Sequence, residues 1–207
     1  LIMNEKQKVK IIIKTLNKIY PKTPIPLKSK NAFTLLISVL LSAQCTDVNV
    51  NAVTKTIYPK FHKPEHFVKL GRKKIEKLIK KIGIFRVKAK SIYLMSKKIL
   101  EKHNGKVPKT FKELEELPGV GHKTASVVMS QGFGYPAFAV DTHIHRLAQR
   151  WELTNGKNVV QTETDLKRIF PEKTWSKLHL QIIFYGREYC KARDCYGLAC
   201  KICTTCF

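Results

Sequence analysis

Acidic residues are scarce in this sequence. Its 207 residues include 15 Asp and Glu against 39 Lys and Arg, which gives a formal net charge of +24. So large a basic excess argues against cationic partners and favours a polyanion such as nucleic acid. Lysine is abundant throughout the chain, and a general compositional bias toward lysine would produce the same excess. The charge is therefore an indication of nucleic-acid binding that needs support from motifs.

Long apolar runs and alternating strand patterns are also missing. No segment is long and apolar enough to cross a membrane, and the first residues contain no secretory apolar region, so we expect an intracellular protein with no membrane partner. Apolar residues instead recur at helical spacing over 9–19, over 64–70 up to Gly71, and over 72–82 and 87–103. Helical patterns without strand patterns predict an all-α fold.

Cysteine is almost absent before residue 190. Only Cys45 stands there, which excludes a disulfide framework spread along the chain, and an intracellular compartment would disfavour disulfides as well. The other five cysteines are Cys190, Cys195, Cys200, Cys203 and Cys206. A cluster this dense at the end of an intracellular chain is typical of metal ligation. From the residues alone, a zinc site of four thiolates and a loop without metal stay open beside an iron–sulfur cluster.

One stretch, Leu117-Pro118-Gly119-Val120-Gly121, organises the chain. Before it, Thr110 with Glu113 forms a capping box that starts a short helix, and the proline and first glycine of the stretch end that helix. Its second glycine leads into another helix, so a helix-hairpin-helix is expected over about 110–131. Glycines leave room for a phosphate to approach the unpaired N–H groups at a helix start. An ordinary helical hairpin without a ligand would show the same pattern.

Two charged residues near this hairpin suit covalent chemistry. Lys123 falls in the first turn of the second helix, where a cation opposes the positive end of the helix dipole. Such a placement costs stability and invites a functional explanation, because an unprotonated lysine amine is a nucleophile. Asp141 follows in the stretch Val-Asp-Thr-His. Its carboxylate can cap the next helix or act as the partner of Lys123, and the residues alone leave both roles open.

The pattern Leu-Pro-Gly-Val-Gly-x-Lys-Thr-Ala, followed by Val-Asp-Thr-His, resembles the endonuclease III family of DNA glycosylases. Further matching segments, in the same order, are 40–47, 82–89, 103–108 and 156–159. The resemblance implies the all-α helix-hairpin-helix DNA glycosylase fold, with two helical lobes and a DNA-binding cleft between them. The central lobe would span 26–135, and the second would combine 1–25 with 136–207, including a Cys-rich loop at 190–206. The expected protein is a monomer in the bacterial cytoplasm, associated with the nucleoid.

The resemblance also implies an activity. The expected enzyme is a bifunctional DNA glycosylase with apurinic/apyrimidinic (AP) lyase activity, which removes oxidised pyrimidines from double-stranded DNA in base excision repair. Lys123 would attack the sugar and form a Schiff base that ends in β-elimination, and Asp141 would stabilise the developing positive charge. Two alternatives are a non-catalytic helix-hairpin-helix protein that only binds DNA, and a glycosylase of the same fold for a different base. Lys123 argues against the adenine glycosylase branch, which lacks this lysine.

Further residues would contact DNA by the same resemblance. Gln44 would enter the gap left by the flipped nucleotide and face the orphaned base, and Ile84 would act as a second, apolar wedge. Taken alone, these two residues favour a glutamine at a helix end and an isoleucine in the core. In the hairpin, the expected DNA contacts are Gly119, Val120, Gly121, His122 and Thr124.

The resemblance finally implies a [4Fe–4S] cluster held by cysteines spaced C-x6-C-x2-C-x5-C. Counted from Cys190, this spacing expects cysteines at 197, 200 and 206, and position 197 is Gly197. The fourth thiolate must then come from elsewhere in the loop. The expected ligands are Cys190, Cys200, Cys203 and Cys206, with Cys195 as the alternative fourth ligand in place of Cys203.

Overall fold

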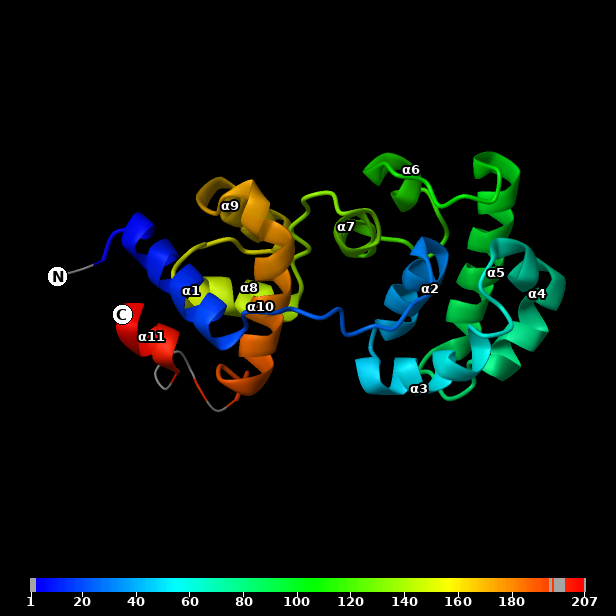
Figure 1. The fold of residues 1–207 in the computed structure, drawn as a ribbon, viewed down its shortest axis with the longest axis horizontal. Coiled ribbons are helices and arrows are strands. Elements are labelled where there is room, and N and C mark those ends of the chain that lie inside the picture. Colours follow the sequence, from blue (N-terminus) through cyan, green and yellow to red (C-terminus); the bar gives the residue numbers. More distant parts are fainter. Residues whose placement is uncertain (1–2, 194, 196–199, 207) are drawn as a thin grey trace. The chain divides into compact units, whose positions relative to one another are not determined.

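The computed structural model describes residues 3–193, 195 and 200–206, and every regular element in these residues is a helix (Figure 1). The expected all-α fold is therefore confirmed. The chain forms two compact units: Ile25–Tyr135, here called the inserted unit, and Leu1–Pro24 with Pro136–Phe207, here called the terminal unit. Among the described residues, no helix has the length and apolar character that a membrane crossing requires.

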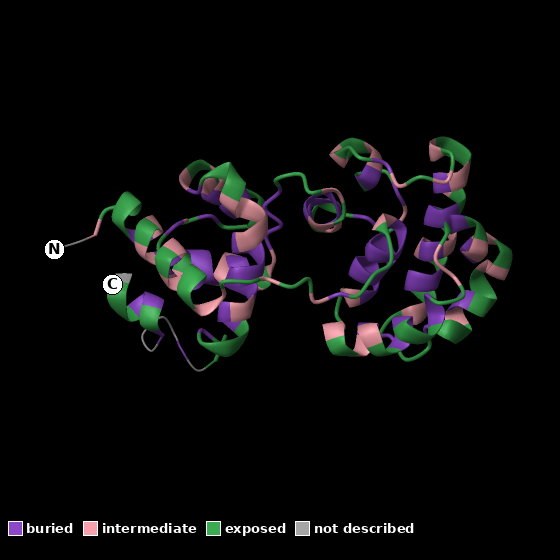
Figure 2. Cartoon of the chain, in the orientation of Figure 1, coloured by how far each residue is buried: buried purple, intermediate pink, exposed green. Residues whose placement is uncertain are grey.

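The inserted unit is built around one buried helix. α2 (Ala32–Ser42) is apolar on all its faces, and Phe33 through Leu41 are all buried (Figure 2). Asn31 caps its start by accepting a hydrogen bond from the Thr34 N–H. The helices around it are α3 (Asp47–Ile57), α4 (Pro64–Leu78), α5 (Phe85–His103), α6 (Phe111–Glu115) and α7 (His122–Val127), which continues into the π-helical turn η1 (Val128–Gly132).

The break expected at Gly71 is present. The backbone there is non-helical, with φ 71° and ψ 159°, so α4 consists of two helical segments joined at a kink. Glycine adopts this left-handed backbone without a side-chain clash, so the chain changes direction and resumes the helix at once. α4 then packs along α5 (Figure 1). The helical pattern had been expected to reach residue 82, and the helix ends earlier, at Leu78.

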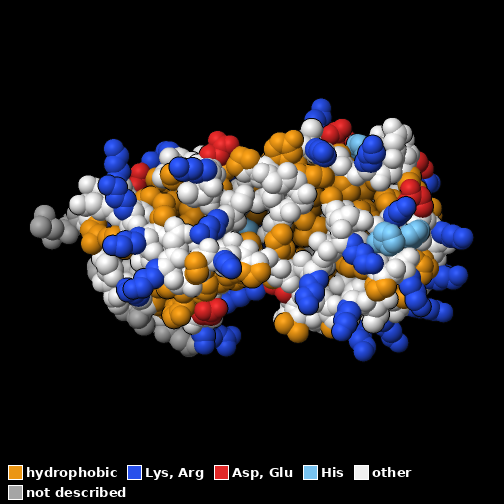
Figure 3. Space-filling view, viewed as in Figure 1, with side chains coloured by type: hydrophobic (Ala, Val, Ile, Leu, Met, Phe, Trp, Pro, Cys, Tyr) orange, Lys and Arg blue, Asp and Glu red, His pale blue; other side chains and the backbone are white. Residues whose placement is uncertain are grey.

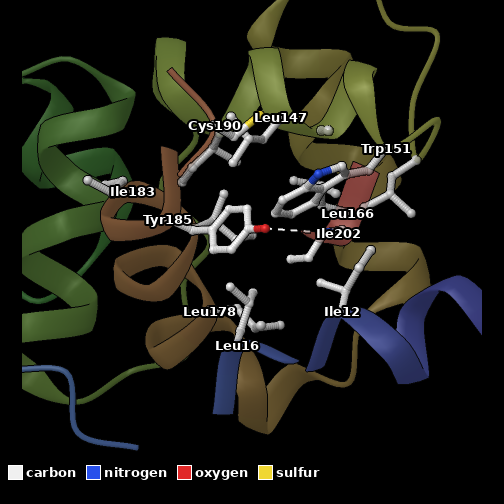
Figure 4. Close-up of a cluster of buried hydrophobic side chains, with 14 of the residues drawn as sticks. Ile12, Leu16, Leu147, Trp151, Leu166, Leu178, Ile183, Tyr185, Cys190 and Ile202 are labelled. Atoms are coloured by element: carbon white, nitrogen blue, oxygen red, sulfur yellow. Dashed lines mark hydrogen bonds between the residues drawn. The ribbon is translucent and has the colours of Figure 1, made fainter. Parts of the chain in front are cut away.

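The terminal unit has its own apolar core (Figure 4). Its helices are α1 (Glu5–Ile19), α8 (Thr142–Arg150), α9 (Val159–Ile169), α10 (Trp175–Glu188) and α11 (Lys201–Cys206), with the 3-10 turn η2 (Glu172–Thr174) before α10. Tyr185 of α10 is fully buried, and its hydroxyl accepts a hydrogen bond from the Ile202 N–H at 3.1 Å. This bond fixes α11 to α10. α11 was not expected from the sequence, because six residues with three apolar side chains show no helical period.

Candidate active site and metal centre

The helix-hairpin-helix is present with its expected cap. Thr110 is the N-cap of α6, and its hydroxyl oxygen accepts from the Glu113 N–H at 3.3 Å. In a capping box the Glu113 side chain would also accept a hydrogen bond from the Thr110 backbone N–H. Here the Glu113 carboxylate instead accepts a hydrogen bond from the Thr110 hydroxyl at 2.6 Å. The predicted start of the first hairpin helix is confirmed, and α7 follows from His122.

The two glycines of the hairpin have different tasks. Gly119 has φ +81°, and a Cβ atom placed there would lie 2.8 Å from both Cβ and Oγ of Ser91. The packing of the hairpin on α5 therefore excludes a side chain at this position. Gly121 is the N-cap of α7, has φ −97°, and a Cβ there would meet nothing within 4 Å. No contact with the described residues requires glycine at 121, which leaves the backbone open to a ligand.

Because the surroundings of the two glycines differ, adding a methyl group should affect stability at Gly119 and DNA binding at Gly121. Gly119→Ala should lower the free energy of unfolding by on the order of 2–4 kcal/mol, through backbone strain and the clash with Ser91. Gly121→Ala should change it by less than about 0.5 kcal/mol, yet weaken DNA binding. Urea unfolding measures the first effect, and fluorescence anisotropy with a duplex that carries a tetrahydrofuran abasic analogue measures the second. Similar stability losses in both variants would contradict these assignments.

His122 joins the two helices of the hairpin. Its Nδ1 lies 2.6 Å from Oε1 of Glu115, and its ring stacks on Phe111 with the ring centroids 5.5 Å apart. Both partners belong to α6, so the turn between the helices is closed by side chains as well as by backbone. By resemblance, His122 was expected only to contact DNA, and its packing partners were missed because they lie across the turn.

Lys123 and Asp141 each stand at the start of a helix. Lys123 is the second residue of α7 and its side chain is exposed. Asp141 is the N-cap of α8, and its Oδ1 accepts hydrogen bonds from the N–H groups of His143 and Ile144, both at 2.9 Å. The capping role expected for Asp141 is confirmed. The two backbone bonds also hold its carboxylate in one orientation, as a group acting on a substrate requires.

Gln44 and Ile84 occupy two turns with unusual backbone geometry. Both residues lie in the left-handed region, with φ +54° at Gln44 and φ +56° at Ile84. Both are exposed, and 53% of Ile84 is accessible, so the interpretation of Ile84 as a core residue is wrong. The turns are in contact, because a Cβ at Gly83 would lie 3.7 Å from the Gln44 carbonyl oxygen. Strained, exposed non-glycine residues of this kind cluster at functional sites.

Four cysteines of the terminal unit meet in its core. Cys190, Cys195, Cys200 and Cys203 are buried, and their Sγ atoms all lie within 4.8 Å of one another. Cys195 and Cys203, expected as alternatives, are therefore brought together with the other two. The side chain of Cys206 lies outside the described part of the structure. Four convergent thiols form the soft, buried donor set that suits an iron–sulfur cluster or a zinc ion.

Two arginines of α8 hold the loop that begins at Cys190. Arg150 donates from Nη1 to Sγ of Cys190 at 3.3 Å and to the Lys191 carbonyl at 2.8 Å. Arg146 donates from Nη2 to the Cys190 carbonyl at 2.9 Å. The hydrogen bond between the thiols of Cys190 and Cys200 lowers the pKa of Cys200 and raises the pKa of Cys190. Sequence reasoning missed both arginines.

Comparison with known proteins shows which class of protein this chain belongs to. A family model described as HhH-GPD superfamily base excision DNA repair protein matches residues 37–172. Endonuclease III of Bacillus subtilis (strain 168) is 40% identical over 206 residues, 99% of this chain and 94% of that protein. Endonuclease III of Escherichia coli (strain K12) is 41% identical over 191 residues, 92% and 90% of the two chains. The structure of a trapped endonuclease III–DNA covalent intermediate matches with a TM-score of 0.90 at 38% identity, over 98% of this chain and 99% of that one.

The hairpin, the helical fold and the family match together describe a base excision DNA repair protein of the HhH-GPD class. Because the identity of about 40% extends along nearly the whole sequence, the chain belongs to the endonuclease III family. It is a DNA glycosylase with AP lyase activity, as expected, and the prediction of a DNA-binding protein without catalysis is not supported. Lys and Arg side chains are spread over both units on the face shown in Figure 3, which fits a DNA-binding surface.

Proposed function

We propose that this enzyme removes oxidised pyrimidines from double-stranded DNA and then cleaves the strand at the resulting abasic site, acting as a monomer. The observation that carries the proposal is the position of Lys123. Its exposed side chain leaves α7 two residues after Gly121, where the helix start is open to a phosphate. A phosphate bound there would place the adjoining sugar within reach of a lysine amine.

In the proposed reaction, the unprotonated amine of Lys123 attacks C1′ of the damaged nucleotide, and the bond between C1′ and the base breaks. The base leaves with the electron pair of that bond and takes up a proton. The sugar ring opens to a Schiff base with the lysine, loss of a C2′ proton follows, and the 3′ phosphate is expelled as the strand breaks. Asp141 stabilises the positive charge on the sugar or moves a proton. Lys123 belongs to the inserted unit and Asp141 to the terminal unit.

Chemistry on a stacked base first requires the nucleotide to leave the duplex. We propose that Gln44 fills the space left behind, where its amide offers a donor and an acceptor to the orphaned base. Ile84 would enter the neighbouring step as an apolar wedge. Their exposure and their contacting turns support this pair of roles.

We propose that Cys190, Cys195, Cys200 and Cys203 hold a [4Fe–4S] cluster. The set differs from the one expected from spacing, because it includes Cys195 and does not use Cys206. The donor chemistry fits, since four buried thiols converge at one point. The group would supply structural stability, tying α11 and the loop after α10 to the core of the terminal unit.

The proposed function is tested by borohydride trapping on two duplexes, one with a single abasic site and one with a single thymine glycol. A covalent adduct is expected on both, because thymine glycol must be excised before the Schiff base is reduced. An undamaged duplex is the control. An adduct on the abasic duplex alone would refute the proposed action on oxidised pyrimidines but would support the lyase activity. No adduct on either duplex, despite tight binding, would refute the lysine mechanism.

A further inference from the structure

The two exposed turns at Gln44 and Ile84 need an external support. Each residue is held with a positive φ, a conformation that costs on the order of 1–3 kcal/mol and persists only where surrounding contacts impose it. For a β-branched residue such as Ile84 the conformation is especially rare. The side chains of both residues point to solvent rather than into the core. The constraint must therefore act on the backbone of the turns.

Lys88 supplies such a constraint at the first turn. Its side chain is 5% exposed, and Nζ donates hydrogen bonds to the carbonyls of Leu41 at 2.9 Å and Ala43 at 2.6 Å. These carbonyls lie at the end of α2, and Ala43 directly precedes Gln44. A cation at a helix C-terminus is favoured by the helix dipole, and a buried ammonium is tolerated only when it is well hydrogen-bonded. Burial lowers the pKa of Lys88, which is consistent with a side chain enclosed by backbone.

Lys88 is also bonded to the second turn. It lies in the first turn of α5, and its backbone N–H donates to the Ile84 carbonyl at 3.2 Å. Lys88 therefore contacts the backbone of both turns. Its side chain bonds to the Gln44 turn, and its main chain bonds to the Ile84 turn. A second link runs in parallel: Nδ2 of Asn49 lies 3.2 Å from the Lys81 carbonyl and 3.2 Å from Sγ of Cys45.

We infer that Lys88 is a positioning residue that locks the two turns into one rigid wedge, so that Gln44 and Ile84 enter the duplex together. It touches neither the reacting sugar nor the lesion in this role. The inference rests on the proposed function, because it assumes that these two residues fill the gap. It predicts that loss of the Lys88 cation impairs steps that need a filled gap and spares the chemistry at Lys123.

The test compares a substrate that needs the wedge with one that does not. Lys88→Met keeps the length and apolar stem of the side chain and removes the three N–H donors. Excision of thymine glycol from a duplex should fall by about tenfold to a hundredfold, the effect of losing charge-assisted hydrogen bonds. Borohydride trapping on a single-stranded abasic oligonucleotide, which has no gap to fill, should stay within about twofold of wild type. Lys90→Met is the matched control, because it removes an exposed lysine from the same helix.

Three further results decide the interpretation. Lys88→Arg can donate to both carbonyls and should recover most of the duplex activity. Asn49→Ala should show the same selective loss to a smaller degree, which keeps the inference testable if Lys88→Met does not fold. Equal losses on the duplex and on the single strand, or no loss on either, would overturn it. Failure of the wild-type protein to form an adduct on the abasic duplex as well as on the single strand would instead count against the proposed lysine chemistry.

Discussion

Lys123→Ala is expected to abolish the borohydride adduct and to lower thymine glycol excision by on the order of a thousandfold or more, the usual effect of removing a nucleophile. Without the amine no Schiff base can form, so neither the excision step coupled to it nor the strand cleavage can follow. Binding of a duplex with an abasic analogue should persist, because the open start of α7 is backbone and remains in place. Denaturing gels that resolve adduct, cleaved strand and intact strand measure all three results.

The loss should be chemical and not structural. The Lys123 side chain is exposed, whereas α7 is held in the fold by Ala125, Ser126 and Val127, which are buried. Truncating an exposed side chain changes stability by about 0.5 kcal/mol or less, so the variant should unfold at the same urea concentration as wild type. Lys112→Ala is the control, since it removes an equally exposed lysine from the other helix of the hairpin. Full activity in Lys123→Ala would show that another group is the nucleophile.

Much of the fold followed from local sequence signals. Thr110 and Asp141 both cap helices at the expected positions, because a capping bond involves residues only two or three apart. The hairpin was predictable for the same reason: proline and glycine act on their own backbone. The different roles of its two glycines could not be predicted, since the side chain that excludes a Cβ at Gly119 is Ser91, on another helix.

The parts of the site that could not be predicted from the sequence depend on contacts between residues far apart along the chain. The left-handed turn at Gln44 is held by Lys88, which is 45 residues away from Ala43 along the chain. No periodicity or motif indicates such a bond. The cysteine arrangement is a similar case. Spacing left Cys195 and Cys203 as alternatives, whereas both lie together with Cys190 and Cys200 in the structure. The contacts near them join residues far apart in the sequence, from Arg150 to Lys191 and from Ile202 to Tyr185.

Cys200→Ser should remove the metal from the protein and destabilise the terminal unit. The four cysteines belong to an apolar core that also includes Leu147, Trp151 and Tyr185, so loss of the proposed cluster would leave polar thiols buried there without their ligand. Structural metal sites of four thiolates contribute on the order of 10 kcal/mol to folding, more than the whole stability of many domains. We expect no bound iron or sulfide, no broad visible absorption, and a thermal transition lowered by tens of degrees or lost.

Two other cysteine variants make this prediction specific to the proposed ligands. Cys45→Ser changes a half-exposed cysteine of the inserted unit and should keep full metal content and stability. Cys206→Ser separates the proposed ligand set from the one expected by spacing: metal is retained if Cys190, Cys195, Cys200 and Cys203 are the ligands, and lost if Cys206 is one of them. Metal analysis also identifies the bound group. Finding zinc and no iron would mean that the thiols hold a zinc ion and not an iron–sulfur cluster. Because Cys203 belongs to α11, whose Ile202 N–H donates to Tyr185, the metal content and the unfolding midpoint should fall together in Cys200→Ser. A variant that loses the metal yet keeps its midpoint would contradict a structural role.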